Sequence, residues 1–216
     1  MKYALFTGVL IFAQPVIAWG PFAHAYIAAK VIPDAPPQVL FGAMSADMNA
    51  ICGRTDINAA YKHLTHHKAD LLCASSFRMG LQTHNSDWGA DSYAHAYFSN
   101  PDEKPYPYTI FKQLSEEMEI SINDAEDIME AIVDYVICRD LGPEFLAEIL
   151  EAVNAVGSSE EQMLVDAFTV PLCTEISNLP HARAERTIRS MFRLDRFLIR
   201  FLVSFMSLPD RLRRTG

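Results

Sequence analysis

The spacing of apolar side chains constrains the fold of this chain more than any other feature of its sequence. Apolar residues recur every three or four positions through most of the 216 residues, and no stretch alternates as a half-buried strand does. The pattern predicts helices over 21–32, 36–48, 57–72, 75–98, 121–138, 143–153, 158–170 and 181–208, and a Pro-rich loop over 100–108. The length suits one domain with a sizeable core. We therefore expect an all-α, compact multi-helix single domain.

Residues 1–18, MKYALFTGVLIFAQPVIA, have the pattern of a signal peptide. A basic Lys2 precedes an apolar run that is short for a membrane span, and Ala18 occupies a plausible cleavage position. Cleavage there makes Trp19 the mature N-terminus, so we expect an exported protein, periplasmic or secreted. Disulfides form in exported proteins, and four cysteines can form two disulfides in three connectivities. The alternative is that the cysteines stay free as buried thiols. They are Cys52, Cys73, Cys138 and Cys173.

Charge is distributed unevenly along the sequence. Residues 183–216 contain nine arginines against three acidic residues, a net charge of +6, which leaves −16 on residues 19–182 once Lys2 is removed. An acidic body argues against specific nucleic-acid binding. The basic, apolar segment 183–216 predicts an amphipathic helix, either in contact with a membrane surface or packed on the same domain with its arginines paired to the body. The acidic residues of 124–134 we interpret as a solvated helix face.

The stretch HNSDWGADSYAH, residues 84–95, gathers four strong metal ligands. Asp87, Asp91 and His95 are four apart and would share one face of a helix, and His84 falls on the same stripe. The intervening residues are largely apolar or aromatic, which indicates burial, and buried carboxylates and imidazoles need partners. A cation would supply one. The alternatives are a polar core satisfied by hydrogen bonds, or a solvated polar face.

Other candidate ligands lie upstream of this stretch. A free amine at Trp19 and its own carbonyl can chelate a metal, and His24 lies about one helical turn away. Asp47 is an isolated acidic residue, and such a residue is usually a helix cap. The stretch YKHLTHH supplies three histidines, of which at least one is expected to point inward. They are His63, His66 and His67.

This order of residues resembles the zinc-dependent phospholipase C and single-strand nuclease superfamily. Members are exported all-α proteins whose mature N-terminal Trp binds zinc through its amine and carbonyl. The resemblance implies two or three zinc ions, with Asp91 as the bridging ligand and His95 as a ligand of the next site. Asp47 and one of the three clustered histidines would complete the first site.

The sequence departs from the family pattern in two places. Where the family has a histidine four residues before the bridging Asp91, this chain has Asp87, and the family-like His84 comes three residues too early. Either a local bulge brings His84 into the site or Asp87 replaces it. The family's third zinc requires a later His-x-x-x-Glu, for which His181 and Glu185 are the candidates.

The resemblance implies a hydrolase in which a zinc-bound hydroxide attacks a phosphodiester, with Asp47 and Asp91 as the catalytic carboxylates. The acidic body and the basic, apolar C-terminal helix favour a phospholipid substrate and a phospholipase C-like activity, acting as a monomer. A nuclease-like phosphodiesterase is the second interpretation. A metal-binding protein without catalysis, and a membrane-associated helical protein, are the alternatives from other classes.

Overall fold

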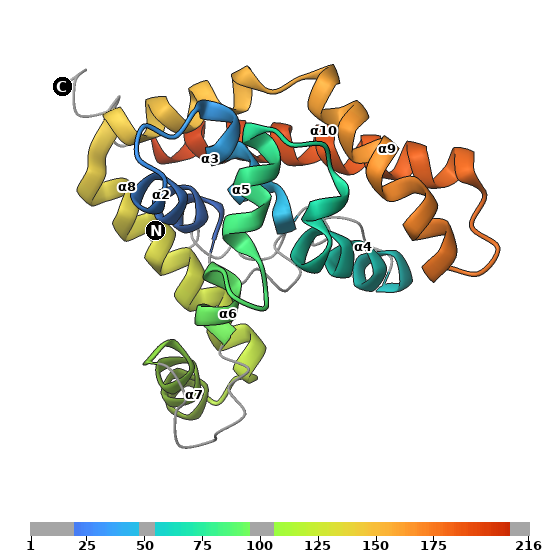
Figure 1. Cartoon of the computed structure of the whole chain (residues 1–216). Coiled ribbons are helices and arrows are strands. Elements are labelled where there is room, and N and C mark those ends of the chain that lie inside the picture. Colours follow the sequence, from blue (N-terminus) through green and yellow to red (C-terminus); the bar gives the residue numbers. More distant parts are fainter. Residues whose placement is uncertain (1–19, 48–54, 96–105, 208–216) are drawn as a thin grey trace.

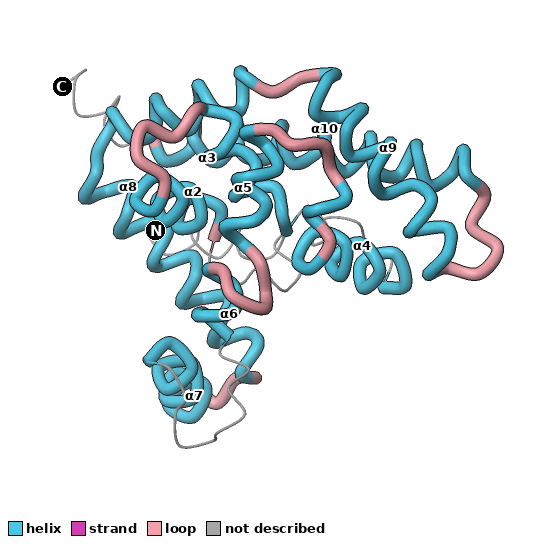
Figure 2. The backbone as a smooth tube through the Cα atoms, viewed as in Figure 1, coloured by secondary structure: helices cyan, strands magenta, loops and turns pink. Residues whose placement is uncertain are grey.

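The structure is a computed structural model that describes residues 20–47, 55–95 and 106–207 (Figure 1). Within those ranges all regular structure is helical and there is no strand, which confirms the all-α prediction (Figure 2). None of the described helices is long and apolar enough to cross a membrane. The helices are α2 Pro21–Val31, α3 Pro37–Met44, α4 Thr55–His67, η2 Ala69–Leu71, α5 Ser76–His84, α6 Ala90–His95, α7 Tyr106–Met118, α8 Ile122–Ala155, α9 Ser158–Glu175 and α10 His181–Met206. The expected signal peptide and Trp19 lie outside the described residues.

Helix α10 runs the length of the molecule behind the shorter helices and belongs to the common core (Figure 1). Its inner face packs on α8 and α9 through Ile188, Phe192 and Ile199, which are almost fully buried. Two of its arginines, Arg189 and Arg193, pair with the buried Glu161 of α9, as in the arginine-pairing alternative. Helix α10 begins at His181, two residues before the segment 183–216 in which we expected the C-terminal helix.

Helices α3 and α5 touch backbone to backbone at two glycines. A Cβ atom on Gly42 would lie 2.2 Å from the carbonyl oxygen of Phe77, and one on Gly80 would lie 2.0 Å from that of Val39. Both distances are far below any van der Waals contact, and both obstructions are backbone atoms that cannot rotate away. The glycines therefore set how closely these two helices approach.

Two sequence predictions need correction. The helix expected over 75–98 is two helices, because the chain turns between His84 and Ala90. Helix α7 begins inside the predicted loop, and its remaining residues were not predicted as helical. By contrast, the two helices expected over 121–138 and 143–153 are both present within α8, where Gly142 has the non-helical φ of 73° and separates them by a kink before Pro143.

No disulfide joins any two of the described cysteines, which corresponds to the free-thiol alternative for these three. Cys73 is exposed, Cys138 is buried and Cys173 is half-buried, and each is a free thiol in the structure. Cys52 lies outside the described residues. Burial, and secondly the nearby Asp134, raises the pKa of the Cys138 thiol to about 12, so this cysteine packs as an apolar side chain.

Candidate metal centre

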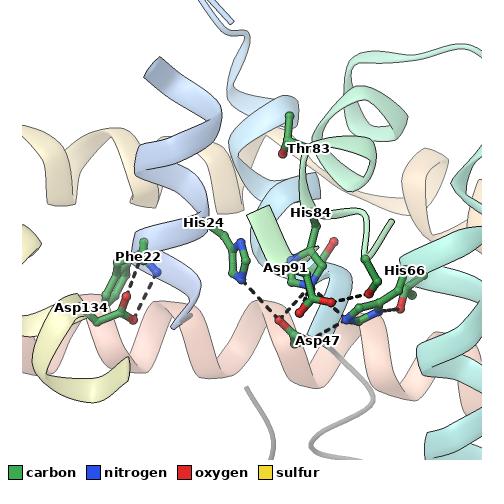
Figure 3. A network of polar contacts seen from close by, with 12 residues as sticks. Phe22, His24, Asp47, His66, Thr83, His84, Asp91 and Asp134 are labelled. Atoms are coloured by element: carbon green, nitrogen blue, oxygen red, sulfur yellow. Dashed lines mark hydrogen bonds and ion pairs between the residues drawn. The ribbon is translucent and has the colours of Figure 1, made fainter. Parts of the chain in front are cut away.

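Five buried side chains from separate segments converge at one point in the core (Figure 3). Three are histidines and two are aspartates, and each is at most 8% exposed. They are His24 of α2, Asp47 from the turn of 3-10 helix after α3, His66 of α4, His84 at the end of α5 and Asp91 of α6. The close contact of α3 with α5 is what brings Asp47 and His84 together, since each lies a few residues beyond one of the two glycines.

Asp47 occupies the middle of this group. Its Oδ1 lies 3.4 Å from Nε2 of His66, and its Oδ2 lies 3.5 Å from Nε2 of His84 and 3.8 Å from Nε2 of His24. The Nε2 atoms of His66 and His84 are 3.0 Å apart. Oδ1 of Asp91 lies 3.8 Å from Nε2 of His84. The imidazoles thus direct the same ring nitrogen toward one carboxylate.

These separations are compatible with ligands around a shared ion. Most of them exceed the range of a good N–H···O hydrogen bond. Two ligand atoms bound to one tetrahedral zinc ion would lie roughly 3.3–3.6 Å apart. Two overlapping groups, His24–Asp47–His84 and His66–His84–Asp91, have ligand atoms that all lie within 4.8 Å of one another. In the described part of the chain, neither oxygen of Asp47 accepts a hydrogen bond, although both are buried. A cation would meet that need.

Thr65 is placed to orient the ring of His66. The Thr65 hydroxyl lies 3.2 Å from the carbonyl oxygens of Tyr61 and Lys62 and 2.9 Å from Nδ1 of His66. A hydroxyl that donates its proton to one of these carbonyls can accept a hydrogen bond from Nδ1–H. In that tautomer Nε2 carries the lone pair, as a metal ligand must.

The turn between α5 and α6 places Asp91 beside His84. The side chain of Asn85 accepts hydrogen bonds from the backbone N–H groups of Asp87 and Trp88, which closes a tight turn directly after His84. Ser86 donates a hydrogen bond to Oδ2 of Asp91, which leaves Oδ1 directed at His84. The turn is the local bulge that admits His84.

The same turn directs Asp87 away from the centre. Its side chain is 67% exposed and binds Nδ1 of His67 at 3.1 Å. His67 stacks near the exposed His63, with ring centroids 5.1 Å apart. Asp87 does not share a helix face with Asp91 as expected, because the chain is not helical from 85 to 89. The backbone of His95 lies in α6, four residues after Asp91. Of the three clustered histidines, His66 alone enters the centre.

The remaining candidates stay outside the five-residue group. His181 is exposed at the first position of α10, Glu185 is half-buried one turn later, and neither belongs to the two ligand groups of the described chain. Trp19 and the side chain of His95 lie outside the described residues.

Two acidic residues beside the centre were missed by sequence reasoning. Asp195 of α10 has its Oδ2 buried without a hydrogen bond among the described residues, and burial, then the charge of Asp47, raises its pKa well above the ordinary range. Asp134 of α8 is buried against the start of α2, and burial raises its pKa to about 7. Both sit in helices rich in charge, where the sequence pattern of a buried acid is the same as that of a solvated one.

Imidazole nitrogens and carboxylate oxygens are donors of the kind that hold divalent first-row metal ions. The chain supplies three of the former and two of the latter around one point, oriented by Thr65 and Ser86. Comparison of the chain with family models, curated proteins and solved structures found no match.

Proposed function

We propose that this chain is an exported, zinc-dependent phosphodiester hydrolase with phospholipase C-like activity. The observation that carries the proposal is Asp47, a buried carboxylate without a hydrogen-bond donor among the described residues, faced by Nε2 atoms of three histidines. A hydrogen-bonded polar core would bring N–H donors to those oxygens at normal hydrogen-bond distances, whereas the ring nitrogens lie 3.4 Å, 3.5 Å and 3.8 Å away. A cation between these atoms would account for that spacing.

The residues divide into ligands for two ions. His66, His84 and Asp91 would hold the first ion together with Asp47, whose Oδ1 faces His66. His24 would hold the second, with the amine and carbonyl of a mature Trp19 as its partners. Asp47 is suited to contact both ions, because its Oδ2 faces His24 as well as His84.

The chemistry follows from this ligand set. Bound zinc supplies an acidic water at neutral pH and offsets the negative charge of a phosphate group. Asp47 and Asp91 would accept the proton that the water releases, and the burial of all five side chains keeps bulk water from screening these charges. A lipid substrate is favoured by the −16 charge on residues 19–182, which opposes the approach of a polynucleotide.

The test is metal content followed by turnover. The mature protein beginning at Trp19 is compared with a version that carries one extra residue before it, and we expect two zinc ions in the first and one fewer in the second. Both are then offered phosphatidylcholine vesicles, single-stranded DNA and a small chromogenic phosphodiester. Release of phosphocholine by the mature protein supports the proposal, and cleavage of DNA alone would make it a nuclease. Absence of bound metal in both versions would overturn it.

A metal-binding protein without turnover is the second candidate. It is favoured by the positions of His181 and Glu185, since in the described structure no pair of this kind joins the five-residue group. It predicts full zinc content with no hydrolysis of any of the three substrates.

A further inference from the structure

We propose that Asp134 is the positioning residue that holds His24 for cation binding. Its carboxylate, brought by α8, holds the first turn of α2 and so determines where His24 stands relative to Asp47. The inference rests on the proposed function, because it takes His24 and Asp47 as ligands of a bound cation.

The contact is a helix cap supplied by another helix. Oδ1 of Asp134 accepts a hydrogen bond from the backbone N–H of Ala23 at 2.8 Å, and Oδ2 accepts one from that of Phe22 at 3.3 Å (Figure 3). The N-cap residue of α2 is Gly20, which has no side chain to perform this role. Free N–H groups at a helix start favour a negative charge, so a carboxylate is the appropriate partner.

Gly20 is required by the same contact. A Cβ atom on Gly20 would lie 2.2 Å from Oδ2 and 2.3 Å from Cγ of Asp134, so the carboxylate occupies the space that any other side chain would need. Gly20 is itself buried. The residue that follows Trp19 is therefore in direct contact with Asp134.

This contact, which we call the clamp, lies directly before the described ligand of the second proposed ion, the N-terminal ion. Phe22 and Ala23 immediately precede His24, whose Nε2 faces Asp47 at 3.8 Å. Loosening the first turn of α2 would move His24, whereas His66, His84 and Asp91 are held by other helices and would stay in place.

The test compares D134N with E161Q in the mature protein. Glu161 is a matched control, because it is also a buried carboxylate that joins two helices, through Arg189 and Arg193, but it lies away from α2. Zinc and cobalt(II) affinities are measured for each ion by competition with a chelating dye. We expect D134N to bind the N-terminal ion about 10–100-fold more weakly and the other ion unchanged. E161Q should lower the Tm and leave both affinities as they are.

Hydrogen exchange separates the failure of this inference from the failure of the proposed function. In metal-free protein, D134N should increase exchange of the amides of Phe22 and Ala23, and E161Q should not. If the wild type binds no metal, the proposed function fails while exchange still decides whether the clamp exists. Unchanged exchange, or unchanged affinity for both ions in a protein that binds two, would overturn the inference.

A second pair of variants keeps the test independent of how well D134N folds. G20A introduces the Cβ that meets the carboxylate and should weaken the N-terminal ion in the same way. In G20A/D134A the obstruction is gone, so the substitution at Gly20 should have a smaller effect on Tm than it has alone. Strictly additive effects of the two substitutions would contradict direct contact.

Discussion

The hydroxyl of Thr65 lies 2.9 Å from Nδ1 of His66, the residue that follows it in α4. Adjacent residues on a helix point in different directions, and this contact turns the ring of His66 back toward the hydroxyl. When Nδ1–H donates to the hydroxyl, Nε2 of His66 faces Asp47 with its lone pair available. Thr65 therefore orients a proposed metal ligand without contacting the ion.

Replacing Thr65 tests that role. T65V keeps the shape of the side chain but removes the acceptor for Nδ1–H, so we expect zinc to bind about 10–100-fold more weakly. T65S retains a hydroxyl and should restore most of the affinity. Calorimetric titration of metal-free protein measures the difference, and equal affinities for the wild type and T65V would contradict the assigned tautomer.

The three clustered histidines should behave differently. H66Q removes a buried side chain that faces Asp47 and is expected to abolish binding of the first ion. H63Q and H67Q alter side chains outside the centre and should leave the zinc content of the purified protein unchanged. Metal analysis of the three variants decides the matter, and loss of zinc in H67Q rather than H66Q would show that the assignment is wrong.

Asp47 should destabilise the metal-free protein and stabilise the metal-bound one. Its oxygens are buried without hydrogen-bond donors in the described chain, and Asp195 adds a second acid nearby. D47N removes the charge, and we expect the metal-free Tm to rise by about 2–8 °C, equivalent to roughly 1–2 kcal/mol. Added zinc should then stabilise the wild type but not D47N.

A metal-free D47N protein that melts below the wild type would argue against this account. It would mean that the carboxylate is held by favourable interactions with the histidines. The site would then be a polar core rather than a cation site.

Asp134 should make stability depend on pH. Its pKa of about 7 in the folded protein exceeds the value of 3.8 expected in the unfolded chain, because burial outweighs the two backbone hydrogen bonds. Between pH 4 and 7 the folded state holds a proton that the unfolded state releases. The free energy of unfolding therefore falls as the pH rises through this window, by up to about 1.4 kcal/mol per pH unit, and levels off above pH 8.

Urea unfolding of metal-free wild type and D134N from pH 5 to pH 8 measures this contribution. The stability of the wild type relative to D134N should decline with pH, and contributions from Asp195 cancel because both proteins contain it. The free energy of unfolding of E161Q should change with pH in the same way as that of the wild type. Hydrogen bonds from Arg193 lower the pKa of Glu161, so this residue titrates below the pH range of the experiment. A constant difference between the wild type and D134N would contradict the raised pKa.

Sequence reasoning found the helices and the ligand types because both depend on local spacing. It placed Asp87 wrongly because four-residue spacing from Asp91 outweighed the turn signals of Asn85 and Gly89, which were equally visible. The side chain of Asn85 closes that turn and ends α5 at His84. A glycine within a helical pattern weakens the prediction of a helix only slightly. We therefore interpreted Gly89 as a weak point inside one helix rather than as the break between two.

Asp134 could not be found in this way. It belongs to the acidic segment 124–134 that was interpreted as a solvated face, yet Glu130 and Asp134 are both buried. Its partners are backbone N–H groups more than a hundred positions earlier in the chain. A contact of that kind leaves no trace in residue spacing, because any sequence provides the N–H groups.

The contact of Gly42 with Gly80 has a consequence for genetics. A random screen for inactive variants should recover alanine and serine substitutions at these two positions as readily as substitutions of the histidines. Such variants would be classified as folding-defective, because glycine has no side chain that could bind a metal or a substrate. Their protein would nevertheless lack bound metal, since a wider gap between α3 and α5 separates Asp47 from His84. Substitutions of Val39 or Phe77 should not rescue such variants, because the atoms that oppose the added methyl group are backbone carbonyl oxygens, which every residue retains.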